Sequence, residues 1–228
     1  MALIVTFAAN HRYRKLAGTL KASLERLHQP YLAVDLGGLG YGLPMTVHSA
    51  TFQTLGFYKT KFTSYPTPAI HKPAAVETAY QTIQTNDVLL SLDADCELQQ
   101  PVTELLDLTF DVAVTDIPPF DRIILGYMKL NSGVIAFRKN PNTNSFIQHW
   151  KLQTTETGDD QAGLVNAYDN LNSSMSILTL PYHLYNRPSG PEHDPNQAPL
   201  TYAKILHHMV SSRNPSVKRL WELRAGQG

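Results

Sequence analysis

From the start of the chain, strand-like apolar runs alternate with segments whose apolar residues recur at helical spacing. Residues 3–9 form an almost unbroken apolar run, which is typical of a buried strand in a parallel sheet. Apolar side chains then recur at helical spacing, at Leu16, Leu20, Leu24 and Leu27. Pro30 ends this helix, and residues 31–35 are again strand-like. Strand, helix and strand at this spacing predict the βα unit of an α/β sheet.

The same two patterns continue along the rest of the chain. Helices are predicted over residues 74–83 after Pro73, around Phe146, Ile147 and Trp150, and over residues 161–168. Strands are predicted over residues 88–92, 112–115, 133–137 and 176–180. Residues 203–210 are predicted to be ordered, without a defined element. Glycine-rich residues 36–43 and proline-rich residues 188–199 predict exposed loops. No clear linker interrupts the pattern, so we expect one α/β domain over residues 1–228.

Composition narrows the possible functions only modestly. The chain has 228 residues, of which 43% are hydrophobic, and a formal net charge of +0. A balanced charge gives no general attraction for nucleic acid or anionic membranes. The apolar runs are too short to span a bilayer, and the N-terminus lacks the pattern of a signal peptide. With Cys96 as the single cysteine, we expect a cytoplasmic protein without a membrane span or internal disulfide.

The most informative motif is Leu89-Leu-Ser-Leu-Asp93-Ala-Asp95, in which two carboxylates follow a very apolar strand. In open α/β sheets, ligands bind at the carboxyl ends of the strands. Residues two apart on an extended chain point the same way, so both carboxylates can face one cation. Oxygen ligands of this kind suit Mg²⁺ or Mn²⁺, which also bind substrate phosphates. A solvated turn after a strand explains the same short motif equally well.

The same motif is also found in haloacid-dehalogenase-like phosphatases, where the first Asp is the nucleophile. Members of that family have Thr or Val two places after the second Asp, where this chain has Glu97. Members of that family also have an acidic residue at a fixed spacing after a Gly-Asp pair. At that spacing after Gly158-Asp159, this chain has Gly163. A metal-dependent phosphohydrolase acting on nucleoside diphosphates is therefore a weaker alternative.

Other stretches resemble the glycogenin-like and nucleotide-diphospho-sugar transferase families, which are glycosyltransferases of the GT-A fold. The resemblance extends from residue 5 to about residue 218 and keeps the order of the family motifs. The matching stretches are Val5-Thr-Phe-Ala-Ala-Asn10-His-Arg-Tyr13, Lys72-Pro73, the Asp93/Asp95 pair, Asn131-Ser132-Gly133, Gly158-Asp-Asp160-Gln161 and Ile205-Leu-His207-His208.

This resemblance implies a Rossmann-like α/β domain of GT-A type that transfers a sugar from a nucleoside-diphosphate donor. UDP is the implied carrier, with retention of anomeric configuration and an unknown acceptor. The resemblance implies Mn²⁺, with Mg²⁺ possible, on Asp93, Asp95 and His207. On an extended segment His208 points away from this site. The implied donor contacts are Phe7, Ala9, Asn10, Tyr13, Lys72, Ser132, Gly133 and Lys218.

The implied catalytic group consists of Asp160, Gln161 and Asn131, which would position the reacting sugar. Lys72 or a basic residue near Lys218 would stabilise the leaving diphosphate. No tyrosine is marked for self-glucosylation, so the resemblance does not extend to glycogenin activity. A catalytically silent protein that binds a nucleotide sugar remains a second alternative. Its paired carboxylates would still require a metal, because burying them without one is costly.

Overall fold

The computed structural model describes residues 2–8, 11–35, 71–119, 129–188 and 202–208. In chain order these residues form β1 (Ala2–Ala8), α1 (His11–Arg26), β2 (Tyr31–Asp35), α2 (Lys72–Thr82), β3 (Val88–Asp93), β4 (Cys96–Leu98), the 3-10 helix η2 (Thr103–Leu106), β5 (Val112–Asp116), β6 (Leu130–Arg138), α4 (Pro141–Thr157), α5 (Asp160–Leu171), β7 (Ile177–Leu180), α6 (Tyr182–Tyr185), β8 (Arg187–Pro188) and β9 (Ile205–His207).

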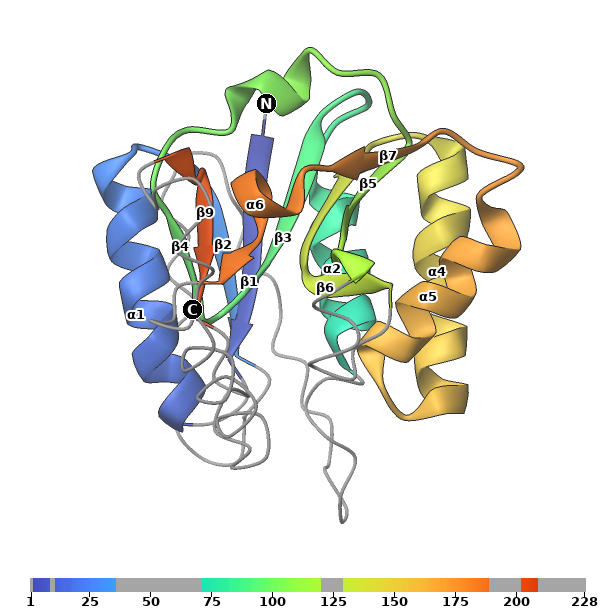
Figure 1. The fold of residues 1–228 in the computed structure, drawn as a ribbon, viewed down its shortest axis with the longest axis horizontal. Coiled ribbons are helices and arrows are strands. Elements are labelled where there is room, and N and C mark those ends of the chain that lie inside the picture. The colour runs from blue at the N-terminus through green and yellow to red at the C-terminus, as the bar shows by residue number, and fades with distance from the viewer. Residues whose placement is uncertain (1, 9–10, 36–70, 120–128, 189–201, 209–228) are drawn as a thin grey trace, which may run out of the picture.

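The central sheet has six strands in the order β2-β1-β3-β6-β5-β7 (Figure 1). β1 pairs in parallel with β2 and β3, and β5 pairs in parallel with β7. β6 runs antiparallel to both of its neighbours, β3 and β5. The beginning of β6 therefore lies at the same edge of the sheet as the carboxyl ends of β3 and β5. This reversal brings Asn131 and Ser132 close to the Asp93 end of β3.

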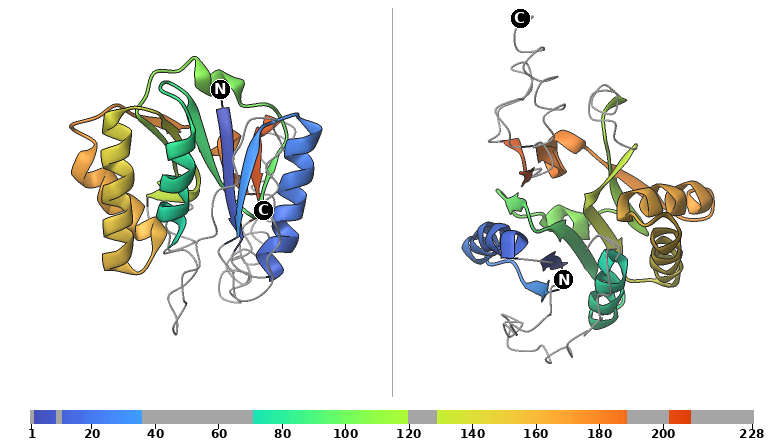
Figure 2. Two further views of the ribbon diagram at one scale, coloured as in Figure 1. Left: turned by 180° about the vertical axis from the view of Figure 1, so that it is seen from behind. Right: turned by 90° about the horizontal axis from the view of Figure 1, so that it is seen from below.

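The two faces of the sheet pack into separate hydrophobic clusters. Along β6, Ile135 and Phe137 belong to the cluster that contains residues of α2, α4 and α5. Val134 and Ala136 belong to the other cluster, with residues of α1, β4, η2 and β9. Figure 2 shows α1 well apart from α2, α4 and α5. The two-residue period of the strands thus buries both faces, as expected for a sheet covered on each side.

A small second sheet, in the order β4-β9-β8, extends the cluster on the α1 side. β9 is antiparallel to β4 and parallel to β8. In this register Cys96 lies opposite His207, although 111 positions separate them in the chain. The pairing therefore brings the C-terminal part of the described chain to the end of β3.

The predicted α/β class and all main elements are confirmed, with small shifts in their bounds. The strand expected at 133–137 begins three residues earlier, at Leu130, and the helix around Trp150 runs over Pro141–Thr157. The short elements β4, η2, α6 and β8 were not predicted, and residues 203–210 were expected only to be ordered. The predicted loop at 36–43, and that at 188–199 beyond Pro188, lie outside the described residues. Among the residues described, no helix is long and apolar enough to cross a membrane.

Candidate active site

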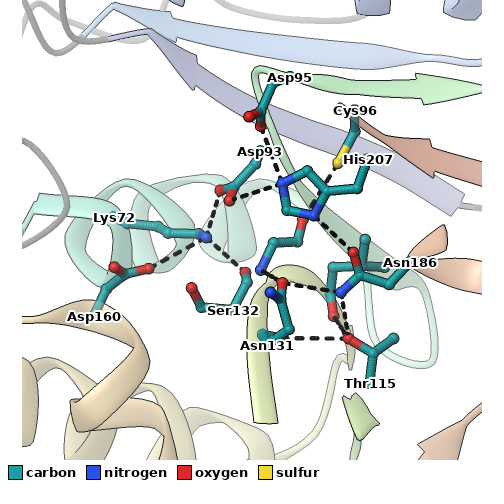
Figure 3. Close-up of polar contacts among 12 residues, drawn as sticks. Lys72, Asp93, Asp95, Cys96, Thr115, Asn131, Ser132, Asp160, Asn186 and His207 are labelled. Carbon is teal, nitrogen blue, oxygen red and sulfur yellow. Dashed lines mark hydrogen bonds and ion pairs between the residues drawn. The ribbon is translucent and has the colours of Figure 1, made fainter. Parts of the chain in front are cut away.

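Three side chains from distant parts of the chain meet where β3 ends. Asp93 is the last residue of β3, Asp95 lies in the turn before β4, and His207 ends β9. Nε2 of His207 lies 3.1 Å from Oδ1 of Asp95 and 3.8 Å from Oδ2 of Asp93 (Figure 3). Asp95 and His207 are buried, whereas Asp93 keeps about a third of its side chain exposed, 32%. One side of the cluster is therefore open to a ligand.

The backbone between the two carboxylates differs from the one that the motif suggested. An extended chain through Asp93 and Asp95 was expected, but residues 94 and 95 form a turn between β3 and β4. The antiparallel pairing of β4 with β9 instead brings His207 to both carboxylates. The expectation that the two histidines point apart is confirmed, because Nε2 of His208 lies 3.2 Å from Oε2 of Glu97.

The cluster has the composition of a divalent-cation site. One ligand atom each from Asp93, Asp95 and His207 lies within 4.8 Å of the others. Two carboxylate oxygens and one imidazole nitrogen suit Mn²⁺ better than Ca²⁺, which prefers oxygen alone. Burial alone would lower the pKa of His207, but the charges of Asp95 and Asp93 outweigh it and raise the pKa. The site therefore attracts positive charge.

Lys72 forms a buried centre of positive charge beside this cluster. Its ammonium group lies 2.6 Å from Oδ1 of Asp93, 2.6 Å from the carbonyl oxygen of Ser132 and 3.3 Å from Oδ2 of Asp160. Burial alone would lower the pKa of Lys72, but the two carboxylates outweigh it and raise the pKa. An ammonium group has three protons, and these three partners accept them all. These contacts hold Lys72 inside the site, and its role toward the diphosphate stays a prediction.

Asp160 is held in place by the junction between α4 and α5. Gly158 ends α4 with a φ of 73°, and the Asp159 side chain caps α5 by accepting a hydrogen bond from the Ala162 amide. Nε1 of Trp150 donates to the carbonyl oxygen of Asp160 at 2.8 Å. Burial raises the pKa of the Asp160 carboxyl group, against the opposing effect of Lys72. Asp159 is thus an exposed cap, whereas Asp160 points into the site.

Asn131 and Gly133 have roles inside the protein that the sequence did not predict. Oδ1 of Asn131 accepts from the Gly133 amide at 2.7 Å and from Nδ2 of Asn186 at 2.9 Å. Any sugar contact by Asn131 would therefore need its amide nitrogen. A Cβ atom on Gly133 would lie 2.4 Å from Cε1 of His207. The glycine leaves room for the imidazole ring, in addition to any role in lining the donor site.

The other predicted donor-binding and catalytic residues fall into two groups. Ala9, Asn10 and Lys218 lie outside the described residues, as do the side chains of Phe7 and Tyr13. Ser132 is buried at the start of β6, and Gln161 is half-buried on the first turn of α5. Their roles toward the donor stay predictions.

Asn186 and Thr115 belong to the buried surroundings of His207, but sequence reasoning missed them. Oδ1 of Asn186 lies 2.7 Å from Nδ1 of His207, and its Nδ2 lies 2.7 Å from Oγ1 of Thr115. Both side chains are completely buried. Asn186 stands between two short elements without periodicity, so its sequence context gave no signal. Thr115 lies within a predicted strand, where its burial was foreseeable but its partner was not.

The sequence matches no protein-family model and no curated protein, whereas its structure resembles solved glycosyltransferases. One is a glycosyltransferase involved in glycosylation of the major capsid of PBCV-1, with TM-score 0.64 and 12% identity, covering 96% of this chain and 98% of that one. Another is GlyE of Streptococcus pneumoniae, with TM-score 0.53 and 16% identity, covering 96% of this chain and 59% of GlyE. The bifunctional glycosyltransferase WbbM has TM-score 0.51 and 12% identity, covering 92% of this chain and 45% of WbbM. The chain therefore has the GT-A-like fold of these glycosyltransferases.

Proposed function

We propose that this protein is a metal-dependent glycosyltransferase that uses a nucleoside-diphosphate sugar. The observation that carries the proposal is the convergence of Asp93, Asp95 and His207 at the sheet edge where α/β proteins bind ligands. The glycosyltransferase fold supports the same assignment independently of these residues. Fold alone does not define an activity, so the proposal depends on the site.

A divalent cation, Mn²⁺ or Mg²⁺, held by these three residues would neutralise the charge that develops on the departing nucleoside diphosphate. Lys72 balances the charges of Asp93, which is partly exposed, and Asp160, which is buried. Asp160 lies on the far side of Lys72 from Asp93 and outside the cation cluster (Figure 3). We assign it to the sugar, where a carboxylate stabilises the positive charge that develops on the reacting carbon.

The finer assignments rest on the sequence resemblance. They are a UDP carrier bound near Tyr13, retention of configuration, and contacts from Phe7, Ala9, Asn10, Ser132 and Gly133. Lys72 or Lys218 would contact the diphosphate, and Lys72 would exchange one of its contacts within the protein to do so. The acceptor is unassigned, and residues 1–228 are proposed to form one domain.

The test is to incubate the protein with a panel of UDP- and GDP-sugars and Mn²⁺, and to measure the products. We expect slow, metal-dependent release of nucleoside diphosphate even without an acceptor. Asp95→Asn should abolish this release, whereas Asp107→Asn, which changes an exposed carboxylate, should not. Release of inorganic phosphate would identify a phosphohydrolase instead. Donor binding without any release, across the whole panel, would identify a silent binding protein.

A further inference from the structure

A chain of buried hydrogen bonds runs from the backbone of β6 to His207. It passes from the Gly133 amide to Oδ1 of Asn131, from there to Nδ2 of Asn186, and from Oδ1 of Asn186 to Nδ1 of His207. The successive distances are 2.7, 2.9 and 2.7 Å. Figure 3 shows Asn186 and the carboxylates on opposite sides of the imidazole ring.

The chemistry of the first link determines the direction of every bond that follows. A backbone amide can only donate, so the Asn131 atom facing Gly133 is the oxygen. That oxygen can only accept, so the Asn186 atom facing it is the amide nitrogen. Thr115 Oγ1 accepts a second bond from the same nitrogen at 2.7 Å. The remaining Asn186 atom, which faces His207, is therefore the oxygen.

An amide oxygen can accept a hydrogen bond but cannot donate one. Nδ1 of His207 must therefore carry a proton that it donates to Asn186. In a neutral imidazole the other nitrogen, Nε2, then has a lone pair, which points at Asp95 and Asp93. In this neutral ring Nε2 and Oδ1 of Asp95 are two acceptors 3.1 Å apart, so their contact becomes favourable when a proton or a metal cation lies between them.

We propose that Asn186 is a positioning residue, which accepts the Nδ1 proton of His207 and directs the unprotonated Nε2 toward the cation site of Asp93 and Asp95. Partners of this kind fix the tautomer and the ring orientation of metal-binding histidines. The inference rests on the proposed metal site, but it does not require that the protein transfers sugar. Asn186 acts only through His207, without contact to the cation.

The first test replaces Asn186 and measures Mn²⁺ affinity by calorimetry. Asn186→Leu keeps the approximate size but removes the acceptor, and we expect about 10- to 100-fold weaker binding, as for other partners of this kind. Asn186→Asp keeps an acceptor oxygen for Nδ1, and we expect it to recover most of the affinity. Thr143→Val removes the bond from another completely buried hydroxyl group to the carbonyl oxygen of Asp111, outside this network, and should leave the affinity nearly unchanged. Melting temperatures of the metal-free variants separate these effects from loss of the fold.

The second test locates the protons on His207 by nitrogen-15 NMR of the wild-type protein loaded with diamagnetic Zn²⁺. The nine histidines are distinguished by the loss of one signal set in His207→Ala. We expect Nδ1 of His207 to carry a slowly exchanging proton and Nε2 to carry none. A proton on Nε2 would overturn the proposal, as would wild-type Mn²⁺ affinity in Asn186→Leu. A protein that passes both tests but releases no nucleoside diphosphate would contradict only the proposed transferase activity.

Discussion

The imidazole of His207 lies directly against the α-carbon of Gly133. A Cβ atom at Gly133 would come within 2.4 Å of Cε1 and 2.9 Å of Nδ1 of that ring. Real Cβ atoms do not approach other atoms so closely, and both sides of the contact are buried. Glycine at this position is therefore a steric requirement of the site.

Gly133→Ala should consequently displace His207 and weaken Mn²⁺ binding, by about 10-fold or more if the ring rotates away from the carboxylates. We expect a cost in stability of about 1–3 kcal/mol from the overpacked contact. Gly18→Ala is the matched control, because a Cβ there meets nothing within 4 Å on α1. That variant should bind Mn²⁺ normally and gain up to about 1 kcal/mol of helix stability. Equal Mn²⁺ affinities in the two variants would show that the ring tolerates the extra methyl group.

Lys72 should be essential to the fold, because it neutralises two carboxylates in a buried setting. Lys72→Met leaves Asp93 and Asp160 without their common cation, so we expect a loss of about 3–5 kcal/mol in the free energy of unfolding. Lys151→Met breaks the half-exposed pair with Glu77 and should cost less than about 1 kcal/mol. Urea unfolding of both variants provides the comparison. If both variants lost a similarly small free energy of unfolding, the contacts of Lys72 with Asp93 and Asp160 would contribute little to stability.

Asp160 should affect turnover far more than donor binding. Asp160→Asn keeps the size of the side chain but removes the charge near the reacting sugar, and should lower turnover by about 100-fold or more. UDP affinity with Mn²⁺ should stay within about threefold, because Asp160 lies outside the cation cluster. Asp159→Asn retains the helix cap and should behave like the wild type. If UDP binding is lost in Asp160→Asn while turnover per bound donor is normal, the assignment to the sugar is wrong.

Glu104 in η2 contacts both α6 and the segment before β9. Oε1 accepts from Lys204, next to β9, at 2.6 Å and from Tyr185, next to Asn186, at 2.5 Å. Burial alone would raise the pKa of Glu104, but Lys204 and Tyr185 outweigh it and lower the pKa. The resulting stability is present above the ordinary pKa of 4.5 and is lost as pH falls through the lowered value of the folded protein.

Glu104→Gln should therefore reduce stability by roughly 1 kcal/mol at pH 7, a modest value because solvent screens the pair. The difference from the wild type should shrink as the pH is lowered below the pKa of Glu104 in the folded protein. Urea unfolding across this pH range measures it. A difference that grows toward acidic pH would show that folding raises the pKa of Glu104 instead of lowering it.

The main strands and helices were predictable because each is long enough to show its period. β3 and residues 133–137 of β6 are nearly continuous apolar runs, and α4 and α5 bury one side each. The antiparallel direction of β6 was not predictable, because a buried strand has the same pattern in either direction. β8 and β9, with two and three residues, are too short to show any period.

Only those residues of the candidate site that lie in family-like motifs were predictable from the sequence. Asp93, Asp95, His207 and Asp160 were identified from family-like motifs, and the structure brings them around Lys72 and β6. Asn186 was missed because its importance comes from a contact across 21 positions of the chain, between two short elements. Lys72 was identified as a site residue, but its sequence position does not reveal that three acceptors surround its ammonium group.

The proposed function requires that Asp93, Asp95 and His207 together bind a divalent cation. The most direct measurement is a Mn²⁺ titration, followed by electron paramagnetic resonance, of the wild type, His207→Ala and His208→Ala. His207 faces both carboxylates, whereas His208 faces Glu97. We predict one tight site in the wild type and in His208→Ala, and at least about tenfold weaker binding in His207→Ala. Undiminished binding in His207→Ala, or a larger loss in His208→Ala, would contradict the account.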